Sequence, residues 1–159
     1  MPTETQQIQN QLIAWLMRRT APAGIRRVAP LSAAVASDIG NVREENQDRV
    51  AIARGIDRQG QDYAVVAVAD GIGGMRDGTT CAAMALGTFL ASVYQHGLSG
   101  SSSSVDWIQR SVNAANQAVF ASFRGDGGST LVAVLVRSGQ PACWLSVGDS
   151  RVYSSSGNV

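Results

Sequence analysis

The sequence predicts an α+β fold in which strands come first, two helices follow and strands return. Three features predict it: short β-rich runs between residues 32 and 69, two long helical patterns in the middle of the chain, and further apolar runs after residue 128. A doubly wound parallel sheet would instead alternate strands and helices along the chain. With 159 residues, of which 45% are hydrophobic and 16% charged, the chain has the size and composition of one globular domain.

The N-terminal segment contains a helical pattern. A helix is expected over residues 5–19, where apolar residues recur at near-helical spacing. Arg18 and Arg19 would end it, and cations are favourable at the C-terminal end of a helix dipole. We expect this helix to pack on its own domain; a membrane-surface or partner-binding role is the alternative.

Two prolines follow this helical pattern. Pro22 and Pro30 lack a backbone N–H and cannot continue a helix, so residues 20–31 are expected to form a linker. The chain is therefore divided into residues 1–31, a helix with its linker, and residues 32–159, the main domain.

Runs of β-branched and small apolar residues predict the strands. Residues 63–69 are continuously small and apolar, which is typical of a strand that is covered on both faces. Shorter runs predict strands on either side of this one and again after the helices. In chain order, strands are expected at residues 32–38, 48–55, 63–69, 129–136 and 141–146, with residues 151–153 opening another hairpin arm.

Two helices are expected in the middle of the chain. Residues 79–95 are rich in alanine and leucine, with the apolar side chains on one side. In residues 105–123 apolar residues recur at helical spacing. The serine-rich residues 99–104 between them are expected to be flexible.

The charge of the chain excludes some partners. The net charge of +1, without any dense cluster of lysine and arginine, predicts no nucleic-acid binding. No apolar run approaches about 20 residues, the length that spans a bilayer. The N-terminus carries Glu4 and a glutamine-rich stretch, where a secretory signal would be basic and then apolar. We therefore expect a cytoplasmic protein without a membrane partner.

The two cysteines do not predict a disulfide or a zinc site. Cys81 and Cys143 lie in unrelated apolar stretches and lack the spacing of such motifs. They are interpreted as small buried hydrophobes in a reducing compartment.

Three aspartates stand where a predicted strand meets a turn. Asp70 follows the most hydrophobic strand and precedes a glycine-rich turn, Asp149 has a similar place near the end, and Asp48 begins a strand. Magnesium and manganese prefer oxygen ligands, commonly one or two carboxylates with waters and substrate phosphate. An arginine nearby would bind the phosphate through its planar fork of donors. These residues would suit phosphoryl chemistry; the alternative is that they are ordinary turn carboxylates.

Four segments together resemble the motifs of bacterial metal-dependent protein serine/threonine phosphatases of type 2C, the PPM family. They occur in the order that this family has and extend over most of the chain. Any one of them alone would be a weak signal. The segments are Ser37–Asp48 (SDIGNVREENQD), Val68–Gly74 (VADGIGG), Gly128–Thr130 (GST) and Gly148–Tyr153 (GDSRVY).

The resemblance implies a fold and a set of site residues. The fold is a sandwich of two antiparallel β-sheets flanked by α-helices, of which this chain would hold the N-terminal half, with the C-terminal half absent. Asp70 would bridge two Mn or Mg ions, and the Gly71 carbonyl would ligate one of them. Asp48 would accept from metal-bound water, Arg43 would hold the substrate phosphate, and Asp149 would lie close to the centre, where some members hold an extra metal.

The resemblance also implies a function. The expected reaction is hydrolysis of phosphoserine and phosphothreonine esters in proteins by metal-activated water, with Arg43 and Asp70 as catalytic residues. The expected partners are a phosphorylated protein substrate and a serine/threonine kinase of the same pathway. In this family further metal ligands come from later motifs, so we expect the chain to be part of a longer protein that continues past Val159.

Two residues depart from the family pattern. Gln47 stands where a glutamate is usual, and Met75 stands where bacterial members commonly have a histidine. The single histidine, His96, falls at the end of a predicted helix and is interpreted as a cation suited to that position.

Gln47, Met75 and the lack of the later ligand motifs favour the alternative of a noncatalytic, truncated phosphatase-like module that binds a phosphoprotein or another partner. The retained Asp70, Asp48 and Arg43 favour the enzyme.

Overall fold

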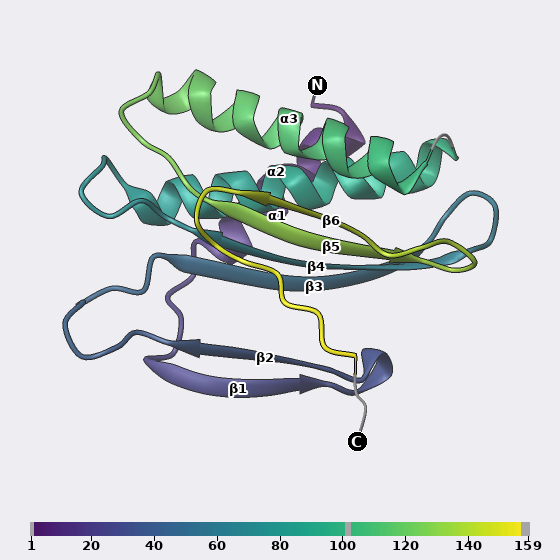
Figure 1. The fold of residues 1–159 in the computed structure, drawn as a ribbon. Helices are drawn as coiled ribbons and strands as arrows, with labels where there is room; N and C mark the ends of the chain where they lie inside the picture. The colour runs from purple at the N-terminus through teal and green to yellow at the C-terminus, as the bar shows by residue number, and fades with distance from the viewer. Residues whose placement is uncertain (1, 101–102, 157–159) are drawn as a thin grey trace.

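The computed structural model describes residues 2–100 and 103–156, which form an α+β fold with three α-helices and two antiparallel β-sheets (Figure 1). The predicted order of strands, two helices and strands is confirmed. The elements are α1 (Glu4–Leu16), β1 (Ala23–Val28), the short 3-10 helix η1 (Ala29–Leu31), β2 (Ala33–Asp38), β3 (Asp48–Ile56), β4 (Asp62–Asp70), α2 (Gly78–Ser99), α3 (Ser104–Phe123), β5 (Leu131–Arg137) and β6 (Cys143–Val147).

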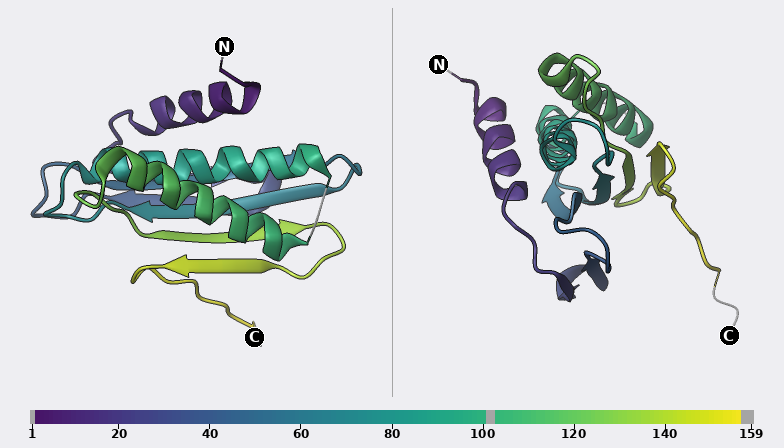
Figure 2. Two further views of the ribbon diagram at one scale, coloured as in Figure 1. Left: turned by 90° about the horizontal axis from the view of Figure 1, so that it is seen from above. Right: turned by 90° about the vertical axis from the view of Figure 1, so that its left-hand side faces the viewer.

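The larger sheet has the strand order β3-β4-β5-β6, and α2 and α3 cover one of its faces (Figure 2). A row of cross-strand neighbours on that face, Ala51, Ala67 and Ala133, is almost fully buried. Because alanine side chains are short, the helices can approach the sheet closely. Leu86 and Phe89 of α2 then fill the core between the layers and have no exposed surface.

Helix α1 packs on its own domain, as expected, and lies beside α2 on the side away from α3 (Figure 2). Leu16 at its end belongs to the core. The helix ends at Leu16 and is followed by Met17 as its C-cap, so Arg18 and Arg19 lie beyond it. Their predicted place in the last helical turn was therefore wrong. Among the described residues, none of the helices combines the length and apolar character that a membrane crossing needs.

The predicted linker at residues 20–31 contains a strand. Residues 23–28 form β1, which pairs with β2 in an antiparallel ribbon from Ala23 opposite Asp38 to Val28 opposite Ala33. The two prolines lie outside the strand, one just before it and the other in η1. The prediction was wrong because β1 is exposed along nearly its whole length and so lacks the buried alternation that marks a strand in a sequence.

Two smaller predictions also need correction. Residues 151–153 have no strand conformation, so the expected hairpin arm does not form within the described chain. The ends of the predicted flexible stretch belong to the helices, because α2 extends to Ser99 and Ser103 caps α3 through a capping box with Asp106. Residues 101 and 102 of the predicted flexible stretch lie outside the described residues.

Cys81 is buried, Cys143 is half-buried, and both are free.

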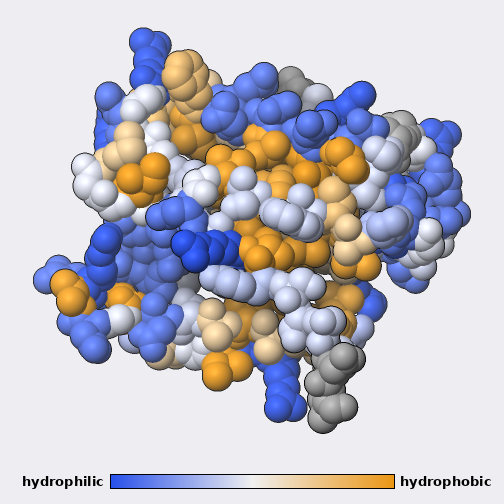
Figure 3. Space-filling view, in the orientation of Figure 1, coloured by the Kyte–Doolittle hydropathy of each residue, from blue (hydrophilic) through white to orange (hydrophobic). Residues whose placement is uncertain are grey.

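The sheet face opposite the helices is apolar and open. One cross-strand row on this face joins Ile52, Val66, Val134 and Trp144. Trp144 is 63% exposed, and β6, which carries it, is the last strand of the sheet. Apolar side chains gather in the middle of the side along which β6 runs (Figure 3). Such an uncovered edge and face favour association unless something covers them.

A buried ion pair closes the end of the sheet away from Asp70. Arg137 and Asp57 lie 3.1 Å apart with side chains 3% and 1% exposed. The Arg137 guanidinium also stacks over Trp107, 4.0 Å from the ring centroid. The backbone N–H of Gln61, together with Arg137, lowers the pKa of Asp57 and keeps it ionised.

The charge predicted for His96 was wrong. The side chain lies near Trp107 in the last turn of α2, half-buried. Burial, and secondarily the charge of Arg110, lowers its pKa from the ordinary 6.5, so it is neutral at neutral pH.

Arg137→Met should lower the free energy of unfolding by about 3 to 5 kcal/mol, because it leaves the Asp57 carboxylate buried without its cation. Arg54→Met, at an exposed arginine of β3, is the control and should change stability by less than about 0.5 kcal/mol. Urea unfolding of the three proteins measures both differences. Equal stability of the two variants would show that the buried pair does not hold this end of the sheet.

Candidate metal centre

The strand register brings two aspartates face to face. Asp48 is the first residue of β3 and Asp70 is the last residue of β4, and the antiparallel pairing places them directly opposite each other. Directly opposed side chains in such a ladder lie about 5 Å apart at their Cβ atoms, so the carboxyl groups can share a ligand. Both extend from the sheet face that the helices leave open.

The electrostatics of this pair are unfavourable without a cation. Burial raises the pKa of Asp48, and Asp70 raises it further through a hydrogen bond between the carboxyl groups and through its charge. Arg49 and Arg43 oppose this shift without cancelling it. Two carboxyl groups that raise a pKa in this way would be stabilised by a positive charge placed between them.

A tight glycine turn follows Asp70. A Cβ atom at Gly71 would lie 2.2 Å from the Gly78 carbonyl oxygen, so no other residue fits there without movement of the backbone. Gly71 also forms a bridge with Ser129. The turn therefore folds back against the first turn of α2, and Asp77 caps that helix by accepting from the Thr80 N–H. This arrangement leaves backbone, without side chains, beside the aspartate pair.

Thr130 holds the backbone of Asp70 and connects it to the turn of Asp149. The Thr130 N–H donates to the Asp70 carbonyl at 2.8 Å, and the Asp70 N–H donates to Thr130 Oγ1 at 3.1 Å. The same hydroxyl lies 2.9 Å from Ser150 Oγ, next to Asp149. One buried side chain thus links two turns that are far apart in the sequence.

One pocket of about 370 Å³ brings together every residue predicted for the site. Arg43 reaches it from the loop between β2 and β3. Its guanidinium lies so close to Gly73 that a Cβ atom there would come within 2.6 Å of Nη1. The pocket is lined by Asp38, Ile39, Arg43, Glu45, Asn46, Gln47, Asp48, Asp70, Gly71, Ile72, Gly73, Thr130 and Asp149.

The residues present fit a magnesium or manganese ion. Such an ion is usually held by one or two carboxylates, with water and phosphate completing the shell. The pair of Asp48 and Asp70 meets that requirement, although no group of three or more potential side-chain ligands is already assembled within the described residues. Gln47 Oε1 is an additional oxygen, buried without a hydrogen-bond partner among the described atoms.

Sequence reasoning missed part of the site. Thr130 belongs to a quoted motif but had no predicted role, and its hydrogen bonds depend on contacts about 60 residues apart in the chain. Asn46 also belongs to a quoted motif without a predicted role, yet its side chain accepts from the Asp48 N–H at 2.9 Å. Met75, where a histidine was noted as usual, does not line the pocket.

The comparisons with known proteins add no assignment. No model of a protein family matches the chain, and no curated protein matches it. The interpretation of the pocket therefore depends on its residues and their geometry.

Asp48→Asn should stabilise the metal-free protein at pH 7. A carboxyl whose pKa is raised by folding is disfavoured when ionised, so its contribution to stability falls as the pH rises through its titration range. Removing the charge should add about 0.5 kcal/mol, the scale of a cross-strand charged pair. Urea unfolding in a chelator at pH 7 and pH 3 measures it: the gain should shrink at pH 3. A less stable variant at pH 7 would contradict the repulsion between the carboxyl groups.

Thr130→Val keeps the shape of the side chain but removes the hydroxyl. We expect a loss of about 1 to 3 kcal/mol, because the Asp70 N–H is left without its acceptor. Amide exchange at Asp70 should be faster, and Thr130→Ser, which retains the hydroxyl, should lose less. Unfolding and amide-exchange measurements that gave identical values for the valine variant and the wild type would rule out this link.

Proposed function

We propose that this chain carries the metal- and phosphate-binding residues of a type 2C protein phosphatase, an enzyme that hydrolyses phosphoserine and phosphothreonine esters in proteins. One observation carries the proposal: a single pocket gathers Arg43, Asp48, Asp70, Gly71 and Asp149. These residues come from three separate parts of the chain. They are also the residues at the motif positions that the resemblance assigns to metal and phosphate.

The metal ligands in this proposal are oxygen atoms at the ends of strands. Asp70 and the Gly71 carbonyl would hold manganese or magnesium, with Asp48 and Asp149 completing the acidic surroundings. When bound, such ions lower the pKa of a water molecule and produce a nucleophile at neutral pH. The opposed carboxyl groups and the glycine turn prearrange this oxygen-rich side of the pocket.

Arg43 would bind the substrate. Its guanidinium can donate two parallel hydrogen bonds to phosphate oxygens. Gly73 leaves room for it, because any larger residue would place a Cβ atom against the guanidinium. Arg43 would thereby orient the phosphorus toward the aspartate pair, and Asp48 would accept a proton or hydrogen bond from the attacking water.

A second candidate is a noncatalytic module that binds a phosphoprotein. The observation in its favour is Gln47, whose neutral side chain lines the pocket where the family usually has a carboxylate. Fewer negative charges would weaken metal binding while Arg43 still recognised the phosphate. The two candidates share one pocket and differ in whether the bound ester is hydrolysed.

Asp70→Asn should abolish manganese-dependent release of phosphate from a phosphothreonine peptide by the full-length protein. The expected loss exceeds about 100-fold, since even residues that only support metal ligands cost 10- to 100-fold when changed. Asp62→Asn, at the exposed other end of β4, is the matched control and should keep wild-type activity.

The outcomes separate the two candidates. Full activity of Asp70→Asn would contradict the assignment of Asp70 as the bridging ligand. Peptide binding by the wild type without phosphate release would favour the noncatalytic module. No binding of either manganese or phosphopeptide would exclude both.

A further inference from the structure

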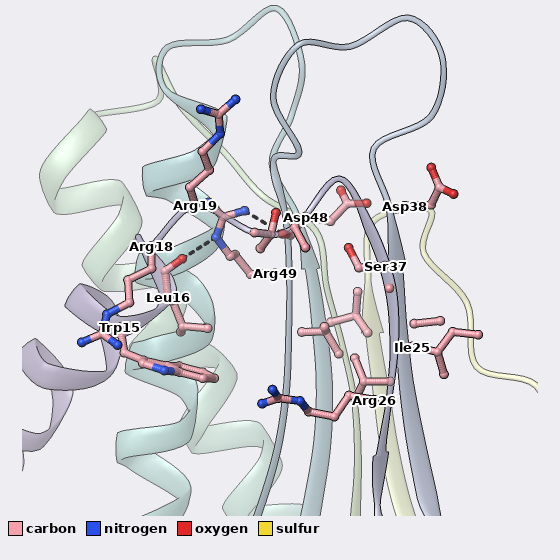
Figure 4. A pocket seen from close by; sticks show the side chains of 17 residues that line it. Trp15, Leu16, Arg18, Arg19, Ile25, Arg26, Ser37, Asp38, Asp48 and Arg49 are labelled. Carbon is pink, nitrogen blue, oxygen red and sulfur yellow. Dashed lines mark hydrogen bonds between the residues drawn. The ribbon is translucent and has the colours of Figure 1, made fainter.

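Arg49 is a buried arginine directly after Asp48. It is only 4% exposed, and it extends from β3 toward Leu16 at the end of helix α1 (Figure 4). Its hydrogen bonds go to backbone carbonyl groups: Nε donates to Leu16, and Nη1 donates to Asn46 and Asp48 at 2.7 Å each. A guanidinium is costly to bury, so three carbonyl acceptors around it indicate a specific structural role.

The first of these carbonyl groups belongs to the end of α1. The last carbonyl groups of a helix have no partner within it, and a cation there is also favoured by the helix dipole. Arg49 supplies both the donor and the positive charge to Leu16, the last residue of α1. The end of the N-terminal helix is therefore bonded directly to the strand that carries Asp48.

The other two carbonyl groups belong to the site itself. Asn46 is held by Arg49 through its carbonyl, while its side chain donates to Ser37 Oγ and accepts from the Asp48 N–H. These bonds determine how the loop of residues 39–47 enters β3. That loop also carries Arg43, so Arg49 supports both the carboxylate and the phosphate-binding arginine.

Helix α1 is itself held against α2. A Cβ atom at Gly87 would lie 2.7 Å from Ile13 Cγ1 and 3.1 Å from the Ile13 nitrogen, so the two helices are in close contact there. Gln9 donates to Thr88 at 3.0 Å, and Thr5 bonds to Gln95. Helix α2 thus fixes the position of α1, and the side chain of Arg49 connects the end of α1 to the site.

We propose that Arg49 is a positioning residue of the pocket, which makes helix α1 a structural part of the site. The loop geometry follows from the hydrogen bonds alone, whereas the predicted effect on metal affinity rests on the proposed function. Amide exchange at Asp48, which reports the loop geometry, and manganese affinity are therefore measured separately.

Gly87→Ala tests the coupling from a distance, because it displaces α1 without touching the pocket. In metal-free protein we expect amide exchange at Asp48 to become about tenfold faster, as a weakened anchor opens more often. The manganese dissociation constant, measured by titration calorimetry, should rise by a similar factor. The matched control is Gly97→Ala on the same helix, where the added Cβ meets the Tyr63 ring at 3.1 Å instead; it should change neither quantity.

Arg49→Met is the second variant. It keeps the apolar stem and removes all three hydrogen bonds, so exchange at Asp48 and in the last turn of α1 should both become faster. Arg49→Lys retains the charge and should recover part of the protection. Unchanged exchange at the Asp48 amide in either Gly87→Ala or Arg49→Met would overturn the proposal. If the wild type bound no manganese, the proposed function would fail, and the exchange rates alone would decide the role of Arg49.

Discussion

The antiparallel register of β3 and β4 is the constraint on which the rest of the site depends. It places Asp48 opposite Asp70, and shifting either strand by one residue would move the carboxyl group of that strand to the other face of the sheet. The register is specified because the same two strands bury Ala51 and Ala67 under the helices. The same β3–β4 pairing therefore positions the core side chains on one face of the sheet and the two aspartates on the other. A change of register would disturb both sets together.

This arrangement concentrates negative charge where little compensates it. The raised pKa of Asp48 reflects that cost, and the surrounding structure offsets it by holding the backbone of both strands. Thr130, just before β5, holds Asp70. Asn46 of the preceding loop and Arg49 of β3, which also bonds to the end of α1, hold Asp48. A site with this electrostatic cost is thus kept in place by hydrogen bonds to the backbone of its two aspartates. This is the organisation expected of a preformed ligand site.

The buried arginines at the two ends of the sheet illustrate two different uses of one residue type. Arg137 pairs with Asp57 and stacks on Trp107, which neutralises its charge within the core. Arg49 has backbone carbonyl partners, so its role is to connect segments: a helix end, a loop and a strand. Of these two arginines, only Arg49 hydrogen-bonds to a residue predicted for the metal site, the Asp48 carbonyl.

The sequence by itself determined the α+β order, the three aspartates at strand ends and the glycine turn after Asp70, because these follow from local composition and periodicity. Tertiary structure decided the rest: that residues 23–28 form a strand, that Thr130 joins two turns, and that Arg49 links α1 to the pocket. The physical reason is that each of these features depends on a partner distant in the chain. The partners include the backbone of a neighbouring strand and the carbonyl group at a helix end, and the packing of the whole fold determines where these groups lie.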